Sequence, residues 1–157
     1  MDQLINLLND LKIKIKYGDL VNESISKSSI LWQINHSYMV VNEISKAIYN
    51  SNPKEYQWKF NQARFMIFLF NKIPRGKAKA PQKARPLENF NQESTQVLYQ
   101  EMINNLLKVK TLDKNSNFNH PFLGQLDKKS TIKFLYLHTN HHAKIVNDIL
   151  NVSKNNF

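Results

Sequence analysis

Two histidines in the last third of the chain have the spacing of a metal-binding pair. His138 and His142 lie four residues apart in the segment 138–142, which reads His-Thr-Asn-His-His. In a helix such residues share one face, because each residue advances about 100° around the axis. Neutral imidazole nitrogens bind Zn, Ni, Cu or Fe(II), so the pair predicts two ligands of one divalent metal. The alternative is a polar strip partly covered by neighbouring helices.

The third histidine of this segment, His141, points in a different direction. It is rotated by about 100° from His142 around the helix axis. The apolar residues that cluster on the side of His142 are Ile132, Leu135, Val146 and Ile149. His138 lies at the edge of that cluster, whereas His141 does not, so we predict that His141 is not a primary ligand.

His36, in an earlier predicted helix, is a candidate partner for the same metal. It lies on the flank of an apolar stripe, near Trp32, Val40 and Ala47, where a lone histidine needs a buried partner. A metal would supply that partner, and a core histidine satisfied by the protein is the alternative. Glu43, two turns later on the same side, is either an acceptor that orients an imidazole or a solvated acid.

Helices must position these side chains. Only three glycines and the lack of Asn-Gly or Asp-Gly turns argue against a sheet-rich fold, so we expect an all-α chain. The expected helices cover residues 2–10, about 30–50, 55–73, about 98–107 and about 130–152. The candidate N-caps are Ser26, Ser28 and Ser29 for the second helix and Asp127 and Ser130 for the last. Pro74 ends the third helix, because the residue before proline is steered out of the α region.

Several other segments carry weaker signals. The alternation over residues 11–16 is either a short strand or a helix end, and residues 117–124 read as a loop. The apolar run 65–70 is far shorter than the roughly 20 residues that cross a bilayer, so we expect it in the core. We interpret His120 as a loop residue packing against its proline, and Trp32 and Trp58 as core or interface anchors.

Composition limits the class of protein. With 157 residues and 41% hydrophobic content, we expect a single domain over residues 1–157. The chain has no Cys, which excludes disulfides, thiolate metal ligands and an internal thiol nucleophile. The N-terminal segment has an acidic residue, Asp2, and lacks both a basic region and a long apolar run. It does not resemble a secretory signal, so we expect a cytoplasmic protein.

The net charge of +10 favours anionic partners, although the lysines are scattered and only one segment concentrates them. That segment is the loop 74–86, and its basic residues are Arg75, Lys77, Lys79, Lys83 and Arg85. It is a solvated connector, a gate for an anionic substrate or a nucleic-acid contact. It lacks the interleaved aromatic residues that would stack on bases, so we do not expect nucleic acid as the main partner.

Three segments together resemble the DinB-like superfamily of metalloproteins. They are residues 31–36 (LWQINH), 119–126 (NHPFLGQL) and 137–142 (LHTNHH). The His-Pro-Phe-Leu-Gly loop and the closing His-Thr-Asn-His-His are most similar to one branch of that superfamily. The similarity spans roughly residues 25–150, which is nearly the whole chain.

The resemblance implies a four-helix bundle of up-down-down-up type, with a short N-terminal helix and long loops. It also implies a divalent transition metal, Zn, Ni or Fe, held by His36, His138 and His142, with no further cofactor and no assigned catalytic residue. Members of the superfamily are commonly dimeric, and some transfer groups to or from low-molecular-weight thiols such as bacillithiol or act as mycothiol-dependent isomerases.

By this analogy we expect a homodimeric transferase or hydrolase that is metal-dependent, acts on a small molecule, and has no membrane partner. A non-catalytic dimeric helical module and a basic nucleic-acid-binding protein are the alternatives.

Overall fold

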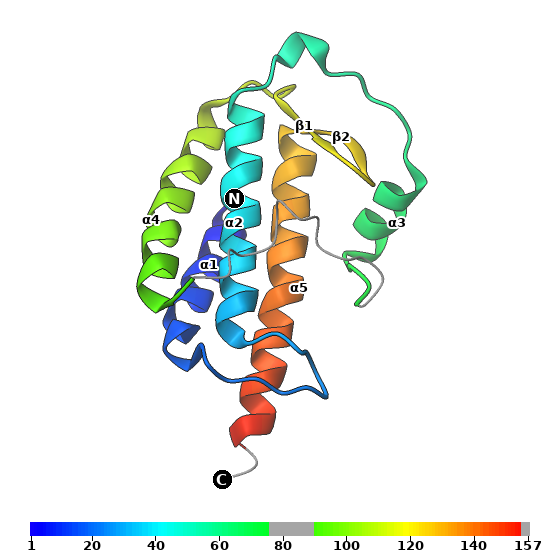
Figure 1. Ribbon diagram of the computed structural model, residues 1–157. Coiled ribbons are helices and arrows are strands. Elements are labelled where there is room, and N and C mark those ends of the chain that lie inside the picture. Colours follow the sequence, from blue (N-terminus) through cyan, green and yellow to red (C-terminus); the bar gives the residue numbers. More distant parts are fainter. Residues whose placement is uncertain (76–89, 155–157) are drawn as a thin grey trace.

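The computed structural model describes residues 1–75 and 90–154, and within them the chain is mostly helical (Figure 1). The α-helices are α1 (Asp2–Ile13), α2 (Ile30–Tyr49), α3 (Gln62–Phe70), α4 (Gln92–Lys108) and α5 (Lys128–Lys154). The short 3-10 helices are η1 (Lys14–Tyr17), η2 (Pro53–Glu55) and η4 (Val109–Thr111), and the strands are β1 (Asn117–His120) and β2 (Gly124–Asp127).

Four of the helices pack together lengthwise. Helix α2 contacts α4 on one side and α5 on the other, and α1 contacts α5 behind them. In Figure 1, α2 and α4 run upward and α1 and α5 run downward, while α3 lies to one side next to the strands. No helix in the described part of the chain has the length and apolar content needed to span a membrane.

Local sequence explains where these helices begin. The Ser29 side chain caps α2 by accepting a hydrogen bond from the Trp32 amide, which confirms one of the three expected serine caps. The Asp127 carboxylate accepts from the Ser130 amide at the start of α5. Helix α4 starts earlier than expected, at Gln92, because Asn91 and Ser94 form a reciprocal capping box.

The core lies between the four packed helices. Its fully buried side chains come from all of them, for example Leu8 of α1, Ile34 of α2, Leu106 of α4 and Val146 of α5. The alternating residues 11–16 complete α1 and enter η1, so this alternation marks a helix end and not a strand.

The all-α expectation is wrong for residues 117–127, which form an antiparallel hairpin. Asn117 pairs with Asp127 and Phe118 with Leu126, and Gly124 takes a positive φ of 69° at the turn. Each strand is four residues long, which is too short for an alternating pattern to be visible in the sequence. His120 ends β1, and its Nδ1 accepts hydrogen bonds from the amides of Phe122 and Leu123.

Helix α3 departs from expectation in both of its ends and in its burial. It begins at Gln62 and not near residue 55, and the segment 65–70 is not a core segment. It ends at Phe70 and not at residue 73 before Pro74, because Asn71 takes a left-handed conformation with φ of 48°. Phe65, Leu69 and Phe70 are 52%, 58% and 65% exposed. Of the segment 65–70, only Ile67 and Phe68 pack partly against the core. Because the run is apolar on every side, its sequence did not indicate which face is buried.

The two tryptophans have different surroundings. Trp58 is 67% exposed, so it is not a core anchor. Trp32 is partly buried and stacks on the ring of His36, with ring centroids 5.0 Å apart.

We predict that Leu106→Ala lowers the free energy of unfolding by about 2–5 kcal/mol, because it leaves a cavity in the core between α4 and α2. Leu107 on the same helix is 42% exposed, whereas Leu106 is fully buried, so Leu107→Ala is the matched control. Its expected cost is about 0.5 kcal/mol or less. Urea denaturation followed by circular dichroism measures both, and equal losses in the two variants would contradict the packing of α4.

Candidate metal centre

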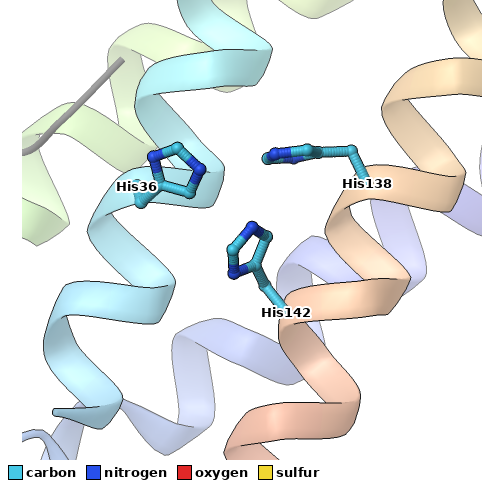
Figure 2. Close-up of side chains that lie close together, drawn as sticks. All are labelled: His36, His138 and His142. Carbon is cyan, nitrogen blue, oxygen red and sulfur yellow. The ribbon is translucent and has the colours of Figure 1, made fainter. Parts of the chain in front are cut away.

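Three imidazoles converge between α2 and α5 (Figure 2). The ring centroid of His36 lies 5.1 Å from that of His138 and 4.7 Å from that of His142, and the last two are 4.6 Å apart. One ring nitrogen from each histidine lies within 4.8 Å of the others. The residues selected from the sequence as the metal-binding set therefore meet at one point in space.

Helix geometry brings them together. His138 and His142 project from successive turns of α5, and His36 projects from α2 at the same level (Figure 2). His36 is 3% exposed and His142 is 8% exposed, because α2 lies between α4 and α5 and is covered on most sides. The site is thus enclosed by the helices that form the core.

Each ring has a distinct environment. The Nδ1 atom of His142 lies 2.6 Å from the side-chain oxygen of Gln33. The ring of Trp32 covers one face of His36. The Nδ1 atom of His138 is buried and has no hydrogen-bond partner among the described residues. A buried nitrogen without a partner is costly in a protein interior, and a cation is one way to satisfy it.

Burial keeps His138 and His142 neutral. It lowers the pKa of His138 and His142 well below the ordinary value, and the neighbouring imidazoles of the cluster lower both further. Neutral rings retain the lone pairs that metal coordination requires. Three nitrogen donors at this spacing, without a carboxylate or thiolate in the group, suit a divalent transition metal.

His141 lies beside the cluster and does not belong to it. Its ring meets that of His142 edge-on at a centroid distance of 5.1 Å, and its side chain hydrogen-bonds to the backbone of Ile73. It is not in the group of nitrogens that could hold one ion. This placement agrees with the rotation of about 100° that separates His141 from His142 on the helix.

Glu43 does not orient any of the imidazoles through a hydrogen bond that the structure describes. Its carboxylate is exposed and accepts from Lys46 at 3.3 Å, on the side of α2 that faces α4. Of the two roles considered for Glu43, the structure agrees with that of a solvated acid. His120 also stays outside the cluster, with its ring edge-on to Phe134 at 4.6 Å, and burial lowers its pKa to about 4.

Sequence reasoning missed Gln33. This residue is 3% exposed and contacts His142 across 109 positions of sequence. A signal was present, because Gln33 precedes His36 by three residues and therefore lies on a neighbouring face of the same helix. A polar residue at that position, beside a candidate ligand, is a natural hydrogen-bond partner for an imidazole of the site.

A surface groove of about 750 Å³ lies next to the cluster, between residues 70–75 and α5. His141 lines it, together with Leu137, Asn140 and Lys144 of the same helix. This volume is in the range of small-molecule sites. Of the basic loop 74–86, only Pro74 and Arg75 are described; Arg75 also lines the groove and pairs with Asp148 at 2.7 Å. The expectations for Lys77, Lys79, Lys83 and Arg85 lie outside the described residues.

Comparison of the chain with models of known protein families, with curated proteins and with solved structures found no match.

The depressed histidine pKa values predict that the metal-free protein loses stability in mild acid. Below pH 6.5 the unfolded chain protonates these imidazoles while the folded protein does not, so the free energy of unfolding falls as pH falls. Each such imidazole contributes a slope of about 1.4 kcal/mol per pH unit. Urea denaturation at pH 7.5, 6 and 5 should show this slope reduced in His142→Gln, and a parent protein with constant stability over this range would contradict it.

Proposed function

We propose that the chain is a DinB-like metalloprotein in which His36, His138 and His142 hold a divalent transition metal. The observation that carries the proposal is the convergence of three imidazoles, two buried and one half-buried, with ring nitrogens within 4.8 Å of one another. In chain order α1, α2, α4 and α5 run down, up, up and down in Figure 1, and this order supports the up-down-down-up bundle that the sequence resemblance implies. Zn, Ni and Fe(II) all accept such donors.

The ligand set favours a catalytic site over a structural one. Structural zinc sites use four protein ligands, whereas catalytic sites use three and keep a position open. A divalent metal held here supplies Lewis acidity, which lowers the pKa of a coordinated water or thiol. The chain has no Cys, so any thiol must come from solution. We therefore propose a metal-dependent transferase or hydrolase that acts on a small molecule, with a low-molecular-weight thiol as the co-substrate of a transferase.

A homodimer is the assembly that we propose. Large apolar side chains remain exposed in and just before α3, at Trp58, Phe60, Phe65, Leu69 and Phe70. All five belong to α3 or to the segment that precedes it. Apolar patches of this kind are typical of protein–protein contacts. The same patch would also serve the alternative function of a non-catalytic dimeric module.

We predict that Zn²⁺ binds the parent protein at one equivalent per chain, and that His36→Ala, His138→Ala and His142→Ala each weaken binding at least about 100-fold. An open three-ligand site cannot lose a ligand without losing most of its affinity. Titration of tag-free protein against a chromophoric chelator measures the affinity, with Ni²⁺ and Fe²⁺ in parallel titrations.

The matched control is His141→Ala, which removes an imidazole adjacent to the cluster. We expect its stoichiometry to remain at one equivalent and its affinity to change less than 10-fold. Equal losses at His141 and His142 would show that the assignment of ligands is wrong. Consumption of a low-molecular-weight thiol with an electrophilic partner by the metal-loaded parent, and not by His138→Ala, tests the transferase reaction.

We predict that the parent protein has the mass of a dimer in light scattering at tens of micromolar. Replacing two exposed apolar residues, in a Phe65→Ser, Leu69→Ser variant, should shift it to monomer without unfolding it, because both side chains are more than half exposed. Val97→Ser on α4, where Val97 is 66% exposed, is the control and should remain dimeric. A monomeric parent would refute the dimer.

A further inference from the structure

We propose that Gln33 is a positioning residue that holds His142 in the tautomer and orientation needed for its Nε2 atom to face the metal. This inference rests on the proposed metal site, and it concerns a residue that does not itself belong to the ligand set. In metal sites generally, a hydrogen bond to the second ring nitrogen of a ligating histidine fixes which nitrogen carries the proton.

The contact is direct and buried. The side-chain oxygen of Gln33 lies 2.6 Å from Nδ1 of His142, and the two residues are 3% and 8% exposed. Gln33 is on α2 and His142 is on α5, so the bond joins the two helices that carry the ligands. Among the described residues, the bond from Gln33 is the side-chain hydrogen bond made by Nδ1 of His142, the ring nitrogen that points away from the cluster.

The orientation of the Gln33 amide determines the direction of this bond. Its Nε2 atom donates to the Ser26 hydroxyl oxygen at 3.0 Å, so its oxygen faces His142. An amide oxygen only accepts, and Nδ1 of His142 must therefore carry the proton. The lone pair of the ring is then on Nε2. Figure 2 shows one nitrogen of His142 facing His36 and His138 and the other pointing away, as this arrangement requires.

Ser26 is itself fixed by the segment that leads into α2. Its hydroxyl oxygen accepts from the Ser28 amide at 3.1 Å, and its own amide donates to the carbonyl of Asn22 at 2.8 Å. A chain of hydrogen bonds therefore runs from the loop before α2 through Ser26 and Gln33 to His142. The loop residues next to α2 thus act on the geometry of the site without touching the cluster.

A neutral acceptor also affects the charge of the site. Gln33 fixes the ring as a carboxylate would, but it adds no negative charge beside the imidazoles of the cluster. A divalent metal there keeps its full charge, which favours an anionic ligand such as a thiolate in the open position. Gln33→Glu retains an acceptor oxygen at the same distance along the side chain and is therefore the conservative variant.

The first test uses metal-free protein labelled with ¹⁵N at histidine. Long-range ¹H–¹⁵N spectra distinguish the two neutral tautomers of His142. We expect the Nδ1–H tautomer in the parent and in Gln33→Glu, and loss of that preference in Gln33→Met, which has a similar shape without an acceptor. An Nε2–H tautomer in the parent, or an unchanged tautomer in Gln33→Met, would overturn the inference.

The second test is the affinity for Zn²⁺ by chelator competition. Gln33→Met should bind about 10- to 100-fold more weakly than the parent, with Gln33→Glu at or above the parent affinity. Asn35→Leu is the matched control, because Asn35 is a buried amide on the same helix whose side chain donates to the hydroxyl of Thr95 at 2.8 Å. It should lose stability without a comparable loss of affinity.

The two tests separate this inference from the metal proposal. A parent protein that binds no Zn²⁺ contradicts the metal site, while the tautomer measurement still decides the role of Gln33. If the parent binds Zn²⁺ and Gln33→Met has the same affinity and the same His142 tautomer, Gln33 does not position His142. The metal proposal is unaffected by that result.

Discussion

The packing of α2 against α5 is the contact on which the rest of the structure depends. Helix α2 is buried between α4 and α5, and this burial places His36 opposite His138 and His142. Polar rings in such a place destabilise a fold unless they find partners. The apolar residues around them, such as Ile34 and Val146, bury enough surface to hold the two helices together despite that cost. The cluster is therefore maintained by the core and does not build it.

The chemistry of the cluster follows from the same burial. The removal of water lowers the pKa of His138 and His142, so both rings are neutral at physiological pH. The carboxylates of Glu43 and Glu101 form ion pairs with Lys46 where α2 contacts α4. Neither carboxylate belongs to the group of side chains that could hold the metal. A metal there would retain its charge, and an anionic ligand from solution would balance it.

The hairpin and α3 belong to the surroundings of the site. His120 at the end of β1 contacts Phe134 of α5, and Phe134 contacts the ring of His138 at a centroid distance of 5.8 Å, so Phe134 links the hairpin to the cluster. Arg64 of α3 donates to the carbonyl of Gln125 in β2 at 2.7 Å and ties α3 to the hairpin. The outer side of α3 stays exposed and apolar, next to the part of the molecule that carries the site.

The sequence by itself predicted the mostly helical fold and the pair His138 and His142, because helical periodicity and i, i+4 spacing are local properties of the chain. His36 was added to the pair from its place beside an apolar stripe and from the family resemblance. It also predicted the separate direction of His141. It did not reveal the hairpin, because strands of four residues carry too little pattern, nor the exposed face of α3, because an apolar helix has no preferred side in its sequence. The bond between Gln33 and His142 joins residues 109 positions apart, and only the packing of α2 on α5 decides such a contact.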